Sequence, residues 1–323
     1  MSSDEEVIEQ NQEQEDAEEK KPKREYNQFD LNVIPTDETV IDLTHTVADN
    51  IPELSRFPNI NTLSLRTNLI KEINANINIA QLTEIDLYDN QIEKIQNLEG
   101  LVNLEILDLS HNRIRTIEGL ESLTKLKKLF LVCNKISALS GLDNLLNLEL
   151  LEVGDNKIKV IENIGHLDKL AELYMGKNKI TKLENLENLK QLRVLSVPGN
   201  RLTSIGDISY LSELEELHIS SQGIDDISGI AGLVKLNILD AGENKISTIP
   251  DLSRLESLED LWLNDNKVSS WKEIQKLEKV KTLRTLYLER NPLYHEDTTA
   301  YRRKMMLTLP QLTQIDAIAC KKG

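Results

Sequence analysis

Carboxylates and histidines are the side chains of this sequence whose types could support catalysis or metal binding. Among 323 residues there are 54 Asp and Glu and five His, and closely spaced carboxylates can hold a metal ion or act as an acid and base pair. The histidines are far apart, however, and the sequence has no His-x-x-x-His pair, no Cys-x-x-Cys pair and no glycine-rich phosphate loop. We therefore expect no catalytic residues, no metal site and no cofactor, and we interpret the acids as a solvated surface.

The elements that would position these side chains are copies of one 22-residue pattern, Leu-x-x-Leu-X-Leu-x-x-Asn, seen for example in residues 104–112. The register is kept without an insertion until a three-residue expansion before the last copy, which leaves no interior linker. The residues at X are Asp42, Ser64, Asp86, Asp108, Phe130, Glu152, Tyr174, Ser196, His218, Asp240, Trp262 and Tyr287. This period is typical of leucine-rich repeats, in which each unit supplies a short strand and a returning connection and is stable only beside its neighbours.

The pattern also predicts which way the side chains point. Because side chains alternate across a strand, the residues on either side of X enter the core and X itself faces outward on the concave surface. The Asn four places after X recurs in ten copies, with Thr46 and Gln222 as exceptions, and we predict that it hydrogen-bonds the backbone of the turn. Gln222, followed by Gly223, indicates a looser turn.

The predicted fold is an α/β leucine-rich-repeat solenoid, a right-handed horseshoe with parallel strands on the concave face. Short helical or 3-10 turns, such as residues 117–123, are expected on the convex face, and a helical cap at the C-terminus. We expect an acidic, disordered segment at residues 1–34, twelve repeats at 35–292 and the cap at 293–323. In the cap, Tyr301 should be an anchor and Arg302 and Arg303 should stay in solvent, while the core is covered by Met305, Met306, Leu309 and Leu312.

The aromatic residues are concentrated at X. Only twelve residues of the chain are aromatic, and four of them, Phe130, Tyr174, Trp262 and Tyr287, occupy X positions. Large rings on outward-facing strand positions have no core to join, and protein interfaces draw their strongest anchors from this class. We predict a protein-binding surface; the alternative is that the rings stack along the sheet and only stabilise it.

The same concave face is predicted to be acidic, with few bases such as Arg66 and Lys128. Its acids are Glu84, Asp86, Asp108, Glu152, Glu172, Glu216, Asp240, Asp260 and Glu289. With a net charge of −16, this field repels phosphate backbones and attracts a basic protein surface. We expect a protein partner, no nucleic acid and no membrane, since the sequence has no run of 18 apolar residues and no signal peptide.

The two cysteines and the basic cluster near the N-terminus give further expectations. Cys133 and Cys320 come from repeats far apart, so we expect neither a disulfide nor a reactive thiol. The first 25 residues hold ten acids and four bases, a balance typical of disorder. The four bases, Lys20, Lys21, Lys23 and Arg24, form either a nuclear-import signal or a solvated charge run. The expected localisation is nucleus and cytoplasm.

Several strings exceed what a generic repeat requires. They are residues 126–132 (LKKLFLV), 176–183 (GKNKITKL), 262–266, 270–271, 287–292 and the cap strings 301–304 and 314–316. Together with the uninterrupted repeats, they make residues 35–320 resemble the leucine-rich-repeat regulatory subunit of protein phosphatase 1. In that family the concave face binds the phosphatase catalytic subunit without a short Val-x-Phe docking peptide.

The resemblance implies which residues contact the phosphatase. They are Asp108, Phe130, Glu152, Tyr174, Asp240, Asp260, Trp262 and Tyr287. Tyr174 stands where the family suggests Phe, and Asp260 where it suggests Glu, which puts the reach and hydrogen bonding of these two contacts in doubt. The resemblance further implies a non-catalytic role in phosphatase maturation, nuclear targeting or mitotic dephosphorylation, with a further phosphatase regulator in a ternary complex as an additional partner.

Two other readings keep the fold and change the function. Similar caps occur in leucine-rich-repeat scaffolds that dock a helix or small domain in ribonucleoprotein particles or in cytoskeletal and motor complexes, but those relatives generally have fewer repeats. An enzyme is the third reading. It would require a turnover that disappears when concave acids such as Asp108 and Asp240 are changed.

Overall fold

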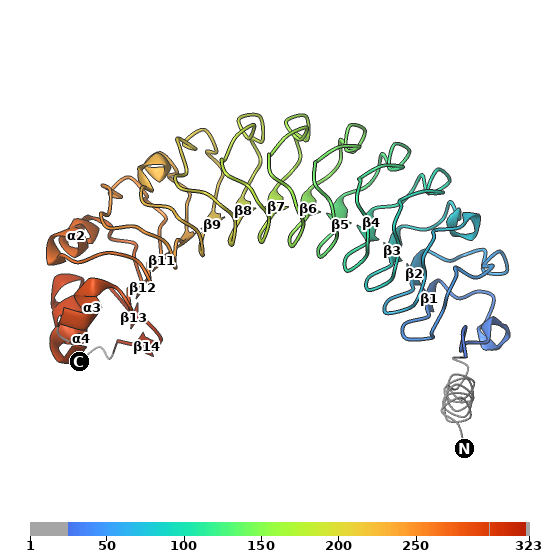
Figure 1. Ribbon diagram of the computed structural model, residues 1–323, viewed down its shortest axis with the longest axis horizontal. Helices are drawn as coiled ribbons and strands as arrows, with labels where there is room; N and C mark the ends of the chain where they lie inside the picture. Colours follow the sequence, from blue (N-terminus) through green and yellow to red (C-terminus); the bar gives the residue numbers. More distant parts are fainter. Residues whose placement is uncertain (1–24, 297, 321–323) are drawn as a thin grey trace, which may run out of the picture.

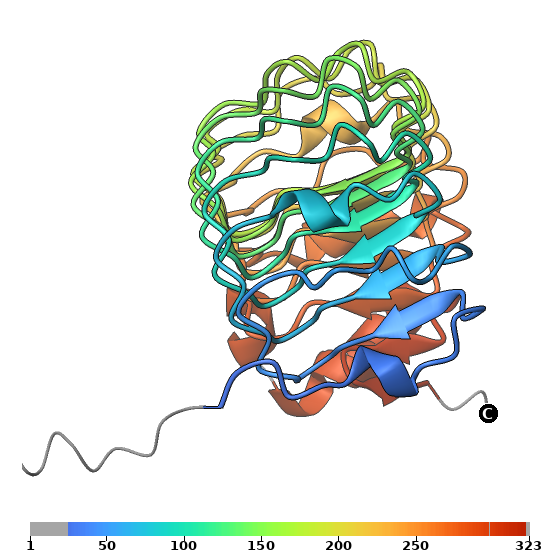
Figure 2. The same ribbon diagram turned by 90° about the vertical axis from the view of Figure 1, so that its right-hand side faces the viewer.

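One continuous sheet lines the inner curve of an arc of stacked coils (Figure 1). The computed structural model describes residues 25–296 and 298–320. Fourteen strands follow one another in chain order; all neighbours are parallel except the last pair, which is antiparallel. Seen from the end of the arc, the coils lie in register with their strands on one side (Figure 2). The predicted solenoid with parallel strands on its concave face is confirmed.

The repeat strands are three residues long, and each ends at X. They are β1 Val40–Asp42, β2 Thr62–Ser64, β3 Glu84–Asp86, β4 Ile106–Asp108, β5 Lys128–Phe130, β6 Leu150–Glu152, β7 Glu172–Tyr174, β8 Val194–Ser196, β9 Glu216–His218, β10 Ile238–Asp240, β11 Asp260–Trp262 and β12 Thr285–Tyr287. The cap adds β13 Gln314–Ile315 and β14 Ile318–Ala319. The helical segments are η1 Leu31–Val33, η2 Ala75–Ile77, η3 Ser228–Ile230, α2 Trp271–Lys276, η4 Leu277–Lys279, α3 Pro292–Glu296 and α4 Thr298–Thr308.

The core is a single cluster that runs from the first coil to the cap. In the coil of β4, Leu107 and Leu109 on either side of Asp108 are fully buried, and Ile114 closes the same layer from the far side. The same alternation holds from β2 to β12, where the middle strand residue is buried and X is not. The inward and outward columns predicted from strand alternation are confirmed.

The Asn column forms a buried hydrogen-bonded spine between neighbouring coils. The Oδ1 of Asn156 accepts the Ile136 N–H at 2.9 Å, and its Nδ2 donates to carbonyls of its own coil and of the preceding one. The structural role predicted for these residues is confirmed. Gln222 keeps the equivalent contacts, accepting from Leu202 N at 3.0 Å and donating to two carbonyls, but it lacks the bond to the carbonyl two residues before it.

The convex connections contain fewer helical turns than the sequence suggested. Within the described residues, helical segments in the returning connections between repeat strands occur only at η2, η3, α2 and η4. Residues 117–123 are not among them: they form turns, one of them closed by Leu123 N donating to Leu120 O at 3.0 Å. Gly119 explains this, because its φ of +68° lies in the left-handed region and interrupts a right-handed helical turn.

The N-terminal end of the array begins earlier than expected. Residues 27–34, which the sequence predicts to be part of the acidic segment, contact the array instead: Asn27 N and Gln28 N donate to the first coil at Val47 O and Thr46 O. The side chains of Phe29, Leu31 and Ile34 pack on the core cluster. These apolar residues cover the first coil, before which the described residues contain no other coil.

The C-terminal helices α3 and α4 cover the last coil, as predicted for a helical cap. Tyr301, Met305, Leu309 and Leu312 are buried, Met306 is partly buried and Arg303 is exposed. The expectation that Arg302 stays in solvent is wrong. Its guanidinium donates to Ile315 O, Ile318 O and Ala319 O at 3.2, 3.2 and 2.7 Å, because several fixed donors suit the clustered carbonyls of the β13–β14 turn.

Candidate protein interface

All twelve X residues end strands β1 to β12 and lie on the concave face, none of them buried. The four aromatic X residues are half-buried, and none of them belongs to the buried core. Only Trp262 and Tyr287 are neighbours in the register; Phe130 lies between Asp108 and Glu152. The alternative in which the rings merely stack on one another therefore applies to one pair at most.

Four of the predicted contact residues form a first cluster, Asp108, Phe130, Glu152 and Tyr174, on the consecutive strands β4 to β7. Burial raises the pKa of Asp108, although its Oδ1 accepts the Ser110 N–H at 2.8 Å. Burial and then the nearby Asp108 charge raise the pKa of Glu152. Two partly desolvated carboxylates thus flank the Phe130 ring, an arrangement that favours a partner cation beside an apolar contact.

Tyr174 carries the hydroxyl that distinguishes it from the Phe suggested by the family. This hydroxyl donates to Glu172 Oε2 at 2.9 Å, on the same strand. Burial, followed by this bond, raises the pKa of Tyr174 to about 12. The hydroxyl is therefore satisfied within the chain, and the ring is held against the sheet beside Glu152.

The other four predicted residues form a second cluster, Asp240, Asp260, Trp262 and Tyr287, on β10 to β12. The Trp262 and Tyr287 rings meet edge to face, with centroids 5.8 Å apart and planes at 66°. The Tyr287 hydroxyl accepts from Gln314 Nε2 at 2.8 Å. The indole Nε1 of Trp262 is shielded from solvent and has no acceptor among the described residues. A buried donor without an acceptor is costly to the folded state.

Ser196 and His218 occupy X between the two clusters, on β8 and β9. The His218 imidazole lies between two carboxylates, with Nδ1 3.9 Å from Asp240 Oδ2 and Nε2 3.3 Å from Glu216 Oε2. Asp240 is the main cause, and Glu216 a further one, of the raised pKa of His218. Partial burial would raise the pKa of Asp240, but His218, Ser220 Oγ and the Gly242 N–H lower it below its usual value.

The prediction based on the X residues did not include a further group on the concave face. Arg66 Nη1 lies 2.8 Å from Asp86 Oδ2 and 3.7 Å from Asp108 Oδ2, and its guanidinium stacks 3.9 Å from the centre of the Tyr88 ring. The Tyr88 ring in turn lies 4.6 Å from His111. This group partly neutralises the acids at β3 and β4. Examining the position two places after X, which also faces the hollow, would have revealed Tyr88 from the sequence.

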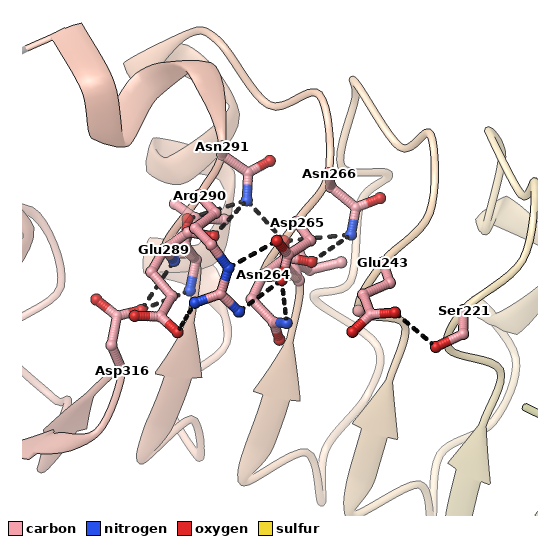
Figure 3. A network of polar contacts seen from close by, with 12 residues as sticks. Ser221, Glu243, Asn264, Asp265, Asn266, Glu289, Arg290, Asn291 and Asp316 are labelled. Carbon is pink, nitrogen blue, oxygen red and sulfur yellow. Dashed lines mark hydrogen bonds and ion pairs between the residues drawn. The ribbon is translucent and has the colours of Figure 1, made fainter.

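The coil that carries Tyr287 is held by a network of charged side chains (Figure 3). Arg290 donates to both carboxylate oxygens of Asp265 at 2.6 Å and also pairs with Glu289. Asp316 accepts from Leu288 N and Glu289 N at 2.8 and 3.0 Å, which ties the cap to the loop after β12. Two-pronged Arg–carboxylate pairs fix geometry, so the loop next to Tyr287 is rigidly placed.

The described residues offer little for other chemistry. They contain no group of three or more His, Cys, Asp or Glu placed to hold a metal ion. Burial, followed by the bond to Asp155, raises the pKa of Cys133 to about 11, which keeps this thiol protonated at neutral pH. No helix in the described part of the chain has the length and apolar character needed to cross a membrane. The basic cluster at Lys20, Lys21, Lys23 and Arg24 lies outside the described residues.

Comparison with known proteins finds two leucine-rich-repeat family models in the chain. "Leucine Rich repeats (2 copies)" matches residues 80–122 and 102–144, and "Leucine-rich repeat" matches residues 149–252. An internalin (inlF) from Listeria monocytogenes has a similar structure, with a TM-score of 0.68 at 27% identity over 88% of this chain and 87% of that one. The leucine-rich-repeat chain of FLRT2 reaches a TM-score of 0.73 at 24% identity, over 88% and 92% of the two chains, which shows the fold alone.

Among curated proteins, the similar sequences are named as phosphatase regulators. The chain is 64% identical over 44 residues to the protein phosphatase 1 regulatory subunit SDS22 homolog of Caenorhabditis elegans, 14% of each chain. It is 45% identical over 62 residues, 19% of each chain, to regulatory subunit SDS22 of Schizosaccharomyces pombe, and 48% identical over 50 residues to human regulatory subunit 7, 16% of this chain and 13% of that one. The matched segments thus span less than a fifth of each relative. The chain belongs to the leucine-rich-repeat proteins, and its resemblance to the leucine-rich-repeat regulatory subunits of protein phosphatase 1 is confirmed.

Proposed function

We propose that this protein is a non-catalytic regulatory subunit that binds the catalytic subunit of protein phosphatase 1 through its concave face. The observation that carries the proposal is the pair of clusters on that face, each with aromatic rings beside carboxylates on adjacent strands. Aromatic anchors framed by acids fit a folded partner whose surface combines apolar pockets with basic side chains. The names of the similar proteins support protein phosphatase 1 as that partner.

Binding would act on the phosphatase by stabilising it, blocking part of its surface or changing its location. We include maturation and nuclear targeting of the phosphatase in the proposal, together with a ternary complex that contains a further regulator. We propose nucleus and cytoplasm as the localisation, because Lys20, Lys21, Lys23 and Arg24 form a compact basic cluster of the kind that import receptors bind.

The second cluster offers the sharpest test of the interface. Trp262→Ala or Tyr287→Ala removes one ring of the edge-to-face pair. Truncating such an anchor costs about 2 kcal/mol of binding energy, which corresponds to a roughly 30-fold rise in Kd for the purified phosphatase catalytic subunit. The measurement is a titration of the purified full chain by calorimetry or fluorescence anisotropy.

Tyr210→Ala is the matched control, because Tyr210 also exposes part of an aromatic ring but lies in the returning connection after β8, away from the concave face. We expect its Kd to equal that of the parent protein. Thermal melting should show that all three variants keep the coil stack. If the parent does not bind the catalytic subunit, the proposed function fails; if it binds and neither concave variant weakens binding, only the assignment of the interface fails.

A further inference from the structure

A line of positive charge runs along one edge of this acidic protein. The residue five places after X is a cation in five consecutive coils, and we call this set the basic ladder: Arg113, Lys135, Lys157, Lys179 and Arg201. The backbone N–H of each donates at 2.8 Å to an Ile carbonyl of the preceding coil, so the five residues lie one above another. Each stands between a buried Asn and a buried Ile or Leu, which directs its side chain out of the core.

The cations of the basic ladder have no partners within the described part of the chain. None of the five takes part in the ion pairs or the side-chain hydrogen bonds found there. In the same coils, the positions three, seven and eight places after X add Arg115, Lys159, Lys177 and Lys182, against one acid, Asp155. This edge is therefore strongly basic in a chain of net charge −16, and the acids of the adjoining convex surface begin only at Glu118, Glu162 and Glu184.

The excess of positive charge on the edge does not continue into the coils on either side of these five. At the same positions in the first three coils there are four acids, Asp49, Glu72, Asp89 and Glu93, and two bases. In the coil after the ladder the edge is acidic at Asp225 and Asp226, and in the two coils after that one acid, Glu243 or Asp265, accompanies each base, Lys245 or Lys267. A column of solvated lysines without a specific role would not show such boundaries. The basic part of the edge is therefore a limited region that coincides with the five ladder coils.

The chain joins the array on this edge. Asn27 N donates to Val47 O at 3.1 Å, and the Asn27 side chain bonds Asp49 Oδ1 at 3.1 Å. Val47 is the residue five places after X in the first coil, so the chain reaches the body of the protein in line with the basic ladder. The residues before this point carry charges in the complementary order: four bases within 20–24 and nine acids without a base within 4–19.

The lengths agree with this order. Strands in neighbouring coils are spaced about 4.8 Å apart, so three steps from Val47 to Arg113 cover about 14 Å and the ladder itself about 19 Å. Extended chain spans up to about 3.4 Å per residue, which gives about 17 Å for residues 20–24 and about 54 Å for residues 4–19. The acidic segment can therefore cover the whole ladder, with length to spare where the curvature widens the spacing.

We propose that residues 4–19 dock along the basic ladder, with the cluster at 20–24 beside the acidic edge of the first three coils. Attachment to the same chain gives the segment a millimolar effective concentration, so individually weak ion pairs suffice. A nucleic acid fits this edge less well. In the ladder coils the edge positions include no Phe, Tyr or Trp on which bases could stack, and the net charge of −16 opposes a polyanion at long range.

The test measures the distance between the two parts of the full-length protein by energy transfer. Dyes are placed at Ser3→Cys and Thr203→Cys, in a Cys133→Ser, Cys320→Ser background; Thr203 lies on the edge in the last ladder coil, two residues after Arg201. Raising salt from about 0.1 M to about 1 M shortens the screening length from about 10 Å to about 3 Å. We expect the transfer efficiency to fall at least twofold over this range, and Lys157→Glu with Lys179→Glu to lower it equally at low salt.

The matched control is Lys245→Glu with Lys267→Glu, which changes the same charge at the same position in two coils beyond the ladder. It should leave the efficiency at the parental value, and thermal melting should show that both pairs of variants remain folded. Equal efficiencies in the parent and the ladder variant, or equal losses in ladder and control variants, would overturn the docking. A low transfer efficiency in the parent protein, together with binding of an added peptide of residues 1–19, would overturn the proposal that the protein's own segment occupies the basic ladder.

Discussion

Replacing one spine asparagine tests whether the array depends on these buried amides. Asn156 is 8% exposed and makes four hydrogen bonds: its Oδ1 accepts from Ile136 N at 2.9 Å, and its Nδ2 donates to Leu131 O, Gly154 O and Val153 O at 2.9, 3.1 and 3.2 Å. The Asn156→Ala substitution removes all four bonds. The four losses differ in their cost in stability, because some of the backbone groups that Asn156 binds have a second hydrogen-bond partner and one does not.

The magnitude follows from the remaining partners. Each of the three carbonyls keeps another donor, namely Asn134 Nδ2 for Leu131 O, Cys133 N for Gly154 O and Asn178 Nδ2 for Val153 O. The Ile136 N–H, in contrast, loses its acceptor in a buried place. An unsatisfied buried group costs about 1–3 kcal/mol, and each of the three weakened bonds about 0.5–1 kcal/mol, so we expect the free energy of unfolding to fall by about 4 kcal/mol.

The assay is urea unfolding of the full chain, supplemented by hydrogen exchange at the Ile136 amide. Asn147→Ala is the matched control: its Nδ2 also donates to a carbonyl, Thr124 O at 2.7 Å, but in an exposed place, so a loss within about 0.5 kcal/mol is expected. Asn156→Gln should fall between the two, because Gln222 keeps the bond to the preceding coil. Equal losses for Asn156→Ala and Asn147→Ala would refute the reasoning that burial makes the spine costly to break.

Two further predictions concern charge. Because nearby Asp240 and Glu216 raise the folded-state pKa of His218, its charged form adds stability below the unfolded-state pKa, and this stability is lost as the pH rises through the folded-state pKa. His218→Gln should therefore lower the free energy of unfolding at about pH 5.5 and change it little at about pH 8.5; urea titrations giving the same loss at both would contradict this. Changing Lys20, Lys21, Lys23 and Arg24 to Ala in a fluorescent fusion should reduce its nuclear fraction, and an unchanged nuclear fraction would count against an import signal.

The repeat period predicted everything that recurs every 22 residues: the strands, the core columns, the spine and the outward direction of X. The period could not predict contacts made by residue types that occur in one coil only. The period places Arg66 and Tyr88 in the same outward column of neighbouring coils, two places after X, but the stacking of the guanidinium on the ring depends on residue types that this column has only in these two coils. The bonds of Arg302 could not be predicted for a related reason, since the carbonyls that it binds belong to strands β13 and β14, a pair that exists only in the cap.

The concave face also differs from a uniformly acidic hollow, and this bears on how a partner would bind. At β3 and β4 the charge of Arg66 offsets Asp86 and Asp108, while His218 lies between two carboxylates at β9. The two clusters are separated by β8 and β9, so the step from β7 to β10 spans about 14 Å. Substitutions farther apart than about 7–10 Å that share no contact residues usually add in their effects. If a partner binds as proposed above, the two clusters are therefore two separate anchor points, and the losses from substitutions in one cluster and in the other should add.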